Sequence, residues 1–310
     1  MNYKGFDDLS RDIKKNLYKI PSDISLVVGI PRSGLLPANL ISLFLNRPLT
    51  DLDNFLKGSI ISSGERGEMH DKDAFTGKIL IVDDSIHSGK ALSKAKAKIK
   101  TLEKQFDIVY CAVYALPGSE HLVDIHFESV EEPRVFEWNI FHHAVLKNAC
   151  VDIDGVLCID PLDSENDDGD CYINFLGAAK AKILPKVKIG TLVTSRLEKY
   201  RSHTEDWLRK NNIKYDELIM MDVPDKATRL KLSNHGEFKA SEYKKKKNAY
   251  LFIESNAGQA QKIFEITGKD VYCVDTNEML SRNSVNFSIL KSRLSRKYKF
   301  LKYKIKQIIK

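Results

Sequence analysis

The segment 79–90, which reads ILIVDDSIHSGK, constrains the fold of the first half of the chain more than any other segment. Its four leading apolar residues predict a strand that is buried on both faces, as in a parallel sheet. Polar and small residues follow the strand: Asp83, Asp84, Ser85, Ser88 and Gly89. They lead into a predicted helix over 90–100, and a loop before a helix turns backbone N–H groups and the positive end of the helix dipole toward an anion. Because open α/β sheets bind ligands at this edge, the sequence predicts a phosphate site here.

Segment 79–92 closely resembles the phosphoribosyl-pyrophosphate (PRPP) motif of the type I phosphoribosyltransferases. In that family the acid pair holds the ribose 2- and 3-hydroxyls, and the loop holds the 5-phosphate. The residues that the resemblance assigns to PRPP are Asp83 and Asp84 for the ribose, Ser85, Ser88 and Gly89 for the phosphate, and His87 in the same loop. The alternative is an ordinary strand-to-helix turn with two solvated acids. The coincidence of strand, acid pair and Ser-Gly loop argues against it.

The loop departs from the family pattern at two positions. Nucleobase enzymes of the family often carry Asp-Thr-Gly-x-Thr here, with the Asp contacting a purine base. The same stretch in this chain is HSGKA, over residues 87–91. Ala91 removes one hydroxyl from the phosphate cradle, and His87 argues against a purine acceptor.

A second turn with anion-binding chemistry lies at 31–34, between a predicted strand over 24–30 and a predicted helix around 36–45. Arg32 offers a planar fork for phosphate oxygens, and glycine permits close backbone approach. Alone, this turn is equally compatible with a simple strand-to-helix connection. Beside segment 79–90 it resembles the pyrophosphate loop of the same family. The residues assigned to it are Arg32, which carries the contact, and its neighbours Ser33 and Gly34.

The rest of the first half contains a predicted helix over 8–18 and a buried strand over 106–115. Segment 118–141 is predicted to be irregular. Segment 55–74 is polar and rich in glycine, and loops of this length are often lids or disordered segments. In the related transferases a flexible loop in this interval closes over the pyrophosphate. Arg66 and His70 are candidates for that role, and a mobile surface loop without chemistry is the alternative.

Asp152 and Asp154 open a second strand–acid–glycine unit, in the run ACVDIDGVL over 149–157. One residue separates the two acids, so one carboxylate is free to attack a phosphorus atom while the other handles a proton. The run resembles motif I of the haloacid dehalogenase (HAD) superfamily in its phosphatase form. The resemblance makes Asp152 the nucleophile that forms an aspartyl-phosphate. It makes Asp154 the acid that protonates the leaving group and then the base for water.

Segments that resemble the other HAD motifs follow in chain order. Predicted strands over 189–193, 215–221 and 249–253 and a helix over 204–212 supply the framework. The residues that resemble the remaining motifs are Thr194 for the phosphoryl hydrogen bond, Lys239 (or its rival Lys226) for the lysine, and Glu254 for the last acid. The resemblance then places Mg²⁺ on Asp152, Glu254 and the backbone carbonyl of Asp154. Two carboxylates, a carbonyl and waters form a chemically adequate set for this ion. Mg²⁺ is expected in both domains.

Residues 158–188, between motif I and the next motif, leave no room for a large cap domain. A HAD site without a cap is open, which suits a bulky phosphorylated substrate. The acidic run over 163–170 is predicted to be a solvated loop, with a bound-cation site as the alternative. Lys244–Lys247 are also predicted to be a solvated run.

The length and the hydrophobic content of the chain favour two well-packed domains. The chain has 310 residues, of which 43% are hydrophobic, and it has no apolar stretch long enough to span a bilayer. No signal-peptide pattern opens the chain, and five scattered cysteines form neither a metal set nor a disulfide frame. Cys111 and Cys273 are expected in the core, and a reducing cytoplasm fits best. We predict an α/β chain of two doubly wound domains. They are a phosphoribosyltransferase fold over 1–145 and a HAD Rossmann-like fold with a minimal cap over 146–285. A basic amphipathic helix over 286–310 follows.

The basic character of the chain is concentrated in its last segment. The net charge is +7, and residues 291–310 contain nine Lys or Arg and no acid, which leaves −2 for everything before them. Apolar residues recur every three or four positions over 289–310, as on one stripe of a helix. Such a helix lies well on an anionic membrane surface, where each basic residue contributes about 1 kcal/mol. Packing against the second domain and nucleic-acid binding are the alternatives; no nucleic-acid partner is expected.

Together, the two halves predict handling of one phosphorylated sugar. The first would transfer 5-phosphoribose from PRPP to an acceptor with inversion to a β-linkage and release of pyrophosphate. The second would remove the 5-phosphate. This arrangement resembles the ribofuranosyltransferases of bacterial surface-polysaccharide clusters, over residues 20–280. That resemblance implies a glycan acceptor, which we expect to be lipid-linked, with the basic tail in peripheral contact with the membrane.

Two other functions stay open. One is a nucleobase phosphoribosyltransferase with a fused phosphatase in nucleotide salvage, against which His87 and Ala91 argue. The other is a PRPP-sensing regulator. A regulator needs neither the acid pair at 152 and 154 nor the Arg32 turn, so it is the weaker alternative.

Overall fold

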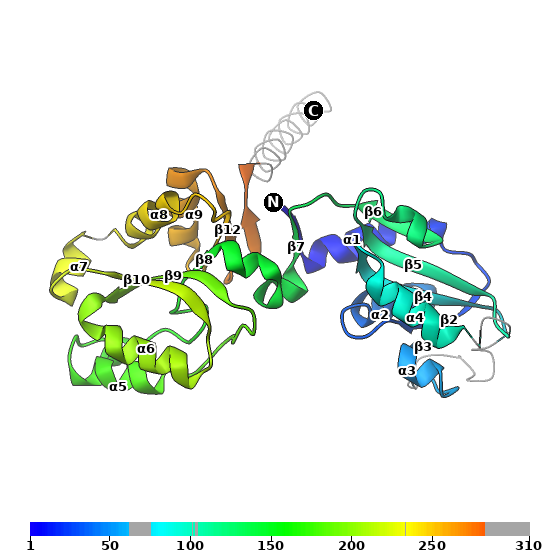
Figure 1. The fold of residues 1–310 in the computed structure, drawn as a ribbon, viewed down its shortest axis with the longest axis horizontal. Helices are drawn as coiled ribbons and strands as arrows, with labels where there is room; N and C mark the ends of the chain where they lie inside the picture. The colour runs from blue at the N-terminus through cyan, green and yellow to red at the C-terminus, as the bar shows by residue number, and fades with distance from the viewer. Residues whose placement is uncertain (62–75, 101, 103–104, 233, 283–310) are drawn as a thin grey trace, which may run out of the picture. The chain divides into compact units, whose positions relative to one another are not determined.

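The computed structural model describes residues 1–61, 76–100, 102, 105–232 and 234–282. The chain divides into two compact units, one formed by Asn2–Trp138 and the other by Met1 together with the residues from Asn139 onward. Each unit contains its own sheet with helices on both faces, as Figure 1 shows. The chain is therefore a mixed α/β protein with predominantly parallel sheets.

The N-terminal unit is built on five parallel strands in the order β3-β2-β4-β5-β6. Their bounds are Ile24–Gly29 (β2), Leu49–Asp51 (β3), Lys78–Ile86 (β4), Ile108–Ala115 (β5) and Ile125–Ser129 (β6). In β4, Ile79 and Ile81 belong to one core cluster, whereas Leu80 and Val82 belong to the other. This alternation explains the continuous apolar run, because both faces of the strand are covered.

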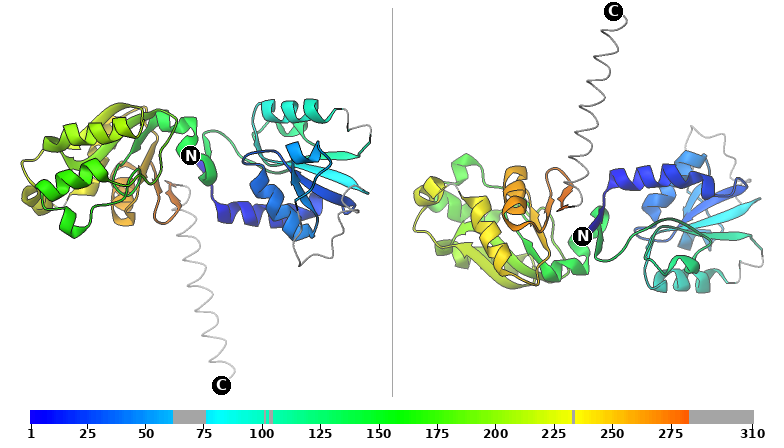
Figure 2. Two further views of the ribbon diagram at one scale, coloured as in Figure 1. Left: turned by 90° about the horizontal axis from the view of Figure 1, so that it is seen from below. Right: turned by 90° about the horizontal axis from the view of Figure 1, so that it is seen from above.

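Helices cover both faces of this sheet. Buried residues of α1 (Phe6–Asn16) and α2 (Leu35–Leu45) pack on one face, and those of α3 (Leu52–Phe55) and α4 (Lys90–Ile99) pack on the other. Figure 2 shows α4 across the sheet from the blue α1. The predicted helices and strands of this half lie close to the observed ones.

Segment 118–141 is not irregular, so that prediction was wrong. It contains β6, the 3-10 turn Glu120–Leu122, and β7 (Arg134–Phe136), which pairs in parallel with β1 (Asn2–Lys4). β6 is a short strand at the sheet edge, and β7 finds its partner at the far end of the unit's sequence. Neither strand has a strong local pattern, because edge position and long-range pairing are not written in neighbouring residues.

The C-terminal unit is built on six strands in the order β10-β9-β8-β11-β12-β13. Their bounds are Ala149–Val151 (β8), Ile189–Leu197 (β9), Tyr215–Met221 (β10), Leu251–Glu254 (β11), Asp270–Cys273 (β12) and Glu278–Leu280 (β13). The first five in this order are parallel, and β13 is antiparallel to β12. The carboxyl ends of β8, β9 and β11 therefore meet at one edge.

Two pairs of helices cover this second sheet. α8 (His235–Lys245) and α9 (Ala257–Thr267) share a core cluster with β8, β9, β11 and β12, and they lie above the sheet in Figure 1. α5 (Asp170–Ala178) and α6 (Arg201–Lys210) contact each other and lie below it. The shorter helical elements are Leu17–Lys19, Glu137–His142, Ala144–Asn148, Asp163–Glu165, Glu198–Tyr200 and α7, Lys226–Leu232.

The acidic run over 163–170 makes structural contacts. Asp167 accepts hydrogen bonds from the backbone N–H groups of Gly169 and Tyr172, both at 2.9 Å, at the start of α5. Asp168 pairs with Lys199 at 3.0 Å. Cys111 and Cys273 are buried, which confirms their predicted place in the core.

Two predicted segments fall outside the described residues. They are the candidate lid residues Arg66 and His70, and the basic tail over 286–310. Within the described ranges, no helix has the length and apolar character needed to cross a membrane.

Replacing Ile81 by Ala tests the packing of the first sheet. Ile81 is fully buried on the central strand β4, so Ile81→Ala should lower the free energy of unfolding by about 2–5 kcal/mol. Urea unfolding followed by circular dichroism measures the change. Lys94→Ala, on the exposed surface of α4, is the matched control and should stay within about 0.5 kcal/mol. A loss below about 1 kcal/mol for Ile81→Ala would contradict the assigned packing.

Candidate active sites

The structure brings the two predicted anion-binding segments of the first half together. Asp83 and Asp84 lie in the last part of β4 and are almost completely buried. The Ser33 hydroxyl, in the turn after β2, donates to Asp84 Oδ1 at 2.8 Å. The Asp84 backbone N–H donates to Asp83 Oδ1 at 2.9 Å. Parallel strands β2 and β4 are neighbours, so their carboxyl ends place both loops at the same edge.

The acid pair carries less negative charge than two free carboxylates. Burial, and then the charge of Asp84, raises the pKa of Asp83 to about 8. The two carboxyl groups lie side by side, so the buried pair takes up a proton more readily than two free acids do. Its carboxyl oxygens offer acceptors for the hydroxyls of a ribose ring.

Glycines shape both loops. A Cβ on Gly34 would lie 2.6 Å from the Ile30 carbonyl oxygen and 2.8 Å from that of Val82, so only glycine fits this close approach. Gly89 precedes α4 with φ of +67°, a left-handed conformation that favours glycine. Arg32, His87 and Ser88 are exposed around these turns and are accessible to a ligand, and Ser85 is partly exposed.

Two residues beside the acid pair, Trp138 and Arg134, were not predicted from the sequence. The Trp138 indole N–H donates to Asp84 Oδ2 at 2.7 Å, and its ring stacks on Phe136 with centroids 5.0 Å apart. Arg134 is buried and donates to the Ile86 carbonyl at 2.8 Å, at the start of the predicted phosphate loop. Both residues belong to the segment around β7, whose pairing with β1 no local pattern predicts. The rarity of tryptophan, with two in the chain, was the one available hint.

The second half gathers a buried charged cluster at the carboxyl edge of its sheet. Lys239 Nζ on α8 donates to Asp152 Oδ2 at 2.6 Å, to Glu254 Oε2 at 2.7 Å and to Gln259 Oε1 at 2.8 Å. Asp152 follows β8 and Glu254 ends the adjacent β11. The rival Lys226 instead contacts the acidic loop, where its backbone N–H donates to Asp168 at 3.0 Å.

Asp154 is held by an arginine that sequence reasoning missed. Arg196 is fully buried, and its Nη2 donates to Asp154 Oδ1 at 2.6 Å while its Nε donates to Oδ2 at 3.0 Å. Burial acts to raise the pKa of Asp154, but the Arg196 guanidinium outweighs it and holds that pKa below its usual range. Thr194 is buried beside this pair, and its hydroxyl oxygen accepts from the Arg196 backbone N–H at 3.3 Å.

The cluster has one more negative charge than positive charge when all groups are ionised. Its acids are Asp152, Asp154 and Glu254, and its cations are Lys239 and Arg196. Burial, with the charges of Glu254 and Asp154, raises the pKa of Asp152 to about 8 although Lys239 opposes the shift. A cation bound at Asp152 would favour the ionised carboxylate, so the charge of the site fits Mg²⁺.

The oxygen atoms of the cluster differ in the number of hydrogen bonds that they accept. Asp152 Oδ1 accepts one hydrogen bond, from the Ile153 N–H at 2.8 Å, and the Asp154 carbonyl accepts one from Ser255 Oγ at 3.3 Å. Both oxygens of Glu254 are engaged, Oε2 by Lys239 and Oε1 by the N–H groups of residues 255 and 256. Asp152 Oδ1, Glu254 Oε2 and the Asp154 carbonyl each accept a single hydrogen bond, so all three predicted ligands keep a lone pair for Mg²⁺. Within the described ranges, no three His, Cys, Asp or Glu side chains gather as a metal site.

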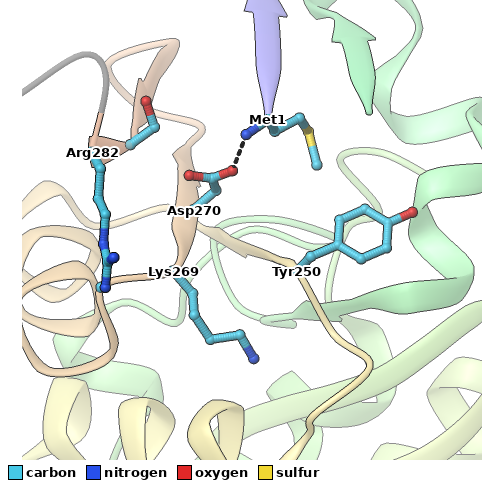
Figure 3. Close-up of a pocket in the computed structure, with 7 residues that line it drawn as sticks. Met1, Tyr250, Lys269, Asp270 and Arg282 are labelled. Atoms are coloured by element: carbon cyan, nitrogen blue, oxygen red, sulfur yellow. Dashed lines mark hydrogen bonds and ion pairs between the residues drawn. The ribbon is translucent and has the colours of Figure 1, made fainter. Parts of the chain in front are cut away.

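A cavity of about 330 Å³ lies elsewhere in the C-terminal unit, as Figure 3 shows. Its labelled lining residues are Met1, Tyr250, Lys269, Asp270 and Arg282. The Met1 ammonium pairs with Asp270, and Lys269 Nζ donates to the Lys246 carbonyl at 2.9 Å. Because these charges are already engaged and no predicted site residue lines the cavity, we do not assign it a reaction.

Comparison with known families decides the nature of the first half. The family described as phosphoribosyl transferase domain matches residues 3–146. Residues 3–146 are a phosphoribosyltransferase domain. The match supports phosphoribosyl transfer from PRPP as the activity of this domain. The matched residues include the acid pair at Asp83 and Asp84. No match was found among curated proteins.

Several solved structures align with part of the chain. Xanthine-guanine-hypoxanthine phosphoribosyltransferase from Helicobacter pylori is 14% identical, with a TM-score of 0.34 and coverage of 45% of this chain and 92% of that one. Purine phosphoribosyltransferase from Pyrococcus horikoshii is 22% identical, with a TM-score of 0.33 and coverage of 44% and 92%. Orotate phosphoribosyltransferase from Aeropyrum pernix is 15% identical, with a TM-score of 0.29 and coverage of 40% and 70%. Each alignment takes in less than half of this chain.

Replacing Trp138 by Phe tests its support of the phosphoribosyltransferase acid pair. Phe keeps the aromatic stack but removes the N–H that fixes Asp84. Trp138→Phe should therefore weaken PRPP binding by about 10- to 150-fold, the equivalent of a charge-assisted hydrogen bond. Calorimetric titration with PRPP and Mg²⁺ measures the dissociation constant. Trp207→Phe, in the other unit, is the control, and an unchanged dissociation constant for Trp138→Phe would contradict the assignment.

Replacing Arg196 by Gln tests the buried ion pair in the second unit. It removes the fully buried guanidinium and leaves the partly buried Asp154 carboxylate unpaired, so Arg196→Gln should lower the free energy of unfolding by about 3–5 kcal/mol. Fluorescence of Trp207, which is buried in the same unit, follows this unfolding in a Trp138→Phe background. Lys199→Gln, which breaks the partly exposed pair with Asp168, should cost about 1 kcal/mol or less. Equal losses for the two variants would show that Arg196 does not hold a buried charge.

Proposed function

We propose that this chain is a bifunctional enzyme of surface-polysaccharide biosynthesis. Its first domain transfers 5-phosphoribofuranose from PRPP to a glycan acceptor, and its second domain removes the 5-phosphate. The observation that carries the proposal is the buried cluster of Asp152, Lys239 and Glu254 in a chain whose other half is a phosphoribosyltransferase domain. One chain would then contain a domain that makes a phosphoribosylated product and a domain that removes its phosphate.

The transfer step follows from the chemistry of PRPP. Asp83 and Asp84 hold the ribose hydroxyls, and the segments at 31–34 and 85–89 hold the pyrophosphate and the 5-phosphate. An acceptor hydroxyl attacks ribose C1, the C1–oxygen bond to the pyrophosphate breaks, and the configuration inverts to a β-linkage. Burial of the acid pair supports this role, because carboxyl groups that are held in place orient the ribose before attack.

The dephosphorylation step uses the HAD-like pattern of the second domain. The Asp152 carboxylate attacks phosphorus, the bond to the sugar oxygen breaks, and an aspartyl-phosphate forms. Lys239 orients Asp152 by holding Oδ2, which leaves Oδ1 with a single backbone hydrogen bond. Water then attacks the phosphorus, inorganic phosphate leaves and the Asp152 carboxylate is regenerated.

Asp154 is poised for the second half of this step. Paired with Arg196, it is an ionised acceptor that can take a proton from water. Protonating the leaving sugar oxygen first requires Asp154 to gain a proton, and therefore to loosen its pairing with Arg196. The resemblance gives Asp154 both roles, and its pairing with Arg196 favours the ionised form that the base role needs.

Asp152, Glu254 and the carbonyl oxygen of Asp154 would hold Mg²⁺ in the second site. When bound, it supplies positive charge that offsets the negative charge of the substrate phosphate. Lys239 and the backbone fix Glu254 in this cluster. The PRPP pyrophosphate brings its own requirement for Mg²⁺ in the first domain.

A glycan acceptor explains why the two activities share one chain. A nucleotide product needs its 5-phosphate, whereas a ribofuranose in a polysaccharide does not. The absence of room for a large cap supports a bulky substrate for the second site. The basic segment 289–310, with its surplus of Lys and Arg, suits contact with an anionic membrane that carries a lipid-linked acceptor, at the cytoplasmic face.

A combined assay tests this function. Incubation with PRPP, Mg²⁺ and lipid-linked or synthetic glycans should yield a ribose-bearing product without phosphate, detected by mass spectrometry. Asp152→Asn should accumulate the same product carrying one phosphate more, because the transferase domain still works. Asp163→Asn, an exposed acid in the same unit, is the matched control and should behave as wild type.

Three outcomes would contradict the proposal. Turnover of a nucleobase in the same assay would favour the salvage alternative. PRPP binding without pyrophosphate release under any acceptor would favour a regulator. A ribosylated product that never loses its phosphate in the wild-type enzyme would remove the phosphatase step.

A further inference from the structure

The two buried cations of the second site are already engaged by protein atoms. Lys239 uses its three N–H groups on Asp152, Glu254 and Gln259. All three nitrogens of Arg196 have acceptors, with Nε and Nη2 on Asp154 and Nη1 on the Thr204 hydroxyl at 3.4 Å. A phosphate monoester brings a charge of about −1.5 to −2 at neutral pH. Its oxygens therefore need donors other than these two side chains.

Uncommitted polar groups lie beside the cluster. Arg229 on α7 is 8% exposed, and its Nη1 donates to the Ser195 carbonyl at 3.1 Å. In the part of the chain that the structure describes, its Nε is buried without a hydrogen-bond partner, and so are Ser195 Oγ and His235 Nδ1. A buried N–H or O–H without a partner costs roughly 1–3 kcal/mol, so three together point to a missing ligand.

These groups converge on one side of the predicted nucleophile. Ser195 lies between Thr194 and Arg196 near the end of β9, the strand next to β8. His235 begins α8 and shares a helix face with Lys239 at spacing i, i+4. Burial, and then the positive charges of Arg229 and Lys239, lowers the pKa of His235, which favours its neutral form.

Tyr172 on α5 is a further neighbour of Arg229. Tyr172 is buried on α5, and its phenol interacts electrostatically with Asp154, Arg196 and Arg229. Arg229 is placed next to the acid site by its bond to the Ser195 carbonyl, because the following residue, Arg196, holds Asp154. The N-terminus of α8, where Asn234 makes no side-chain cap, adds the positive end of an eleven-residue helix.

We propose that Arg229, Ser195 and His235 form the binding seat for the phosphoryl group of a phosphate monoester. Arg229 Nε and the Ser195 hydroxyl donate to non-transferred oxygens of the phosphoryl group, and His235 closes the seat from α8. The proposal rests on the phosphatase function and adds its substrate-binding residues. It divides the work, because Lys239 orients the nucleophile whereas Arg229 and Ser195 hold the substrate.

This division predicts different kinetic effects for the two sets of residues. Arg229→Gln keeps size and polarity but removes the charge and the Nε donor. It should raise KM for p-nitrophenyl phosphate, and the inhibition constant of inorganic phosphate, by about 10- to 100-fold, more than kcat falls. Ser195→Ala should raise both constants by about 3- to 10-fold. Lys239→Gln should act mainly on kcat. Lys231→Gln, exposed on the same helix as Arg229, is the matched control and should leave all constants unchanged.

The full-length protein with Mg²⁺ is used throughout, and circular dichroism checks the fold of each variant. A wild-type protein that hydrolyses the ester, with KM and inhibition constant unchanged in both Arg229→Gln and Ser195→Ala, overturns the seat but not the phosphatase. Failure of the wild type to hydrolyse any phosphate monoester overturns both. Where Arg229→Gln does not fold, Ser195→Ala decides alone.

Discussion

The hydrogen bond and ion pair between Lys239 and Asp152 is the interaction on which the second half of the molecule depends. Lys239 is buried and joins a helix to the ends of two adjacent strands, because Asp152 follows β8 and Glu254 ends β11. Charges this deep are tolerated when they are paired and hydrogen-bonded. With Arg196 on Asp154, the cluster fixes two carboxylates at one sheet edge and carries one more negative than positive charge when all groups are ionised. The proposed function adds a cation and a phosphorylated ligand to this site.

Both halves solve the same structural problem in the same way. Parallel strands end at one edge, and acids at that edge are held by side chains from other segments. In the phosphoribosyltransferase domain, Ser33 and Trp138 each bind one oxygen of Asp84. In the C-terminal unit, Lys239 and Arg196 do this for Asp152 and Asp154. The difference lies in the partners, since Asp84 is held by neutral donors, whereas Asp152 and Asp154 are held by buried cations.

The sequence predicted the two α/β units and most strands, because buried parallel strands are continuous apolar runs with polar residues at their ends. It also proposed the residues that the structure gathers at each edge, including Lys239 beside Asp152. It missed β7 and Trp138, whose bond to Asp84 spans 54 positions, and Arg196, whose pairing with Asp154 spans 42. Arg229 and its unpartnered Nε were equally invisible. The partners of these groups are far away in the chain, so no local pattern predicts them. Whether a donor is buried without a partner can be seen only in the structure.

The central claim is that one chain first transfers phosphoribose and then removes its phosphate. Its most direct test is the fate of PRPP labelled with ³²P at the 5-phosphate, in the presence of Mg²⁺ and a glycan acceptor. The account predicts labelled inorganic phosphate in a one-to-one ratio to pyrophosphate, with both products absent when the acceptor is omitted. Labelled phosphate released without an acceptor, or pyrophosphate released while the label stays on the product, would contradict it.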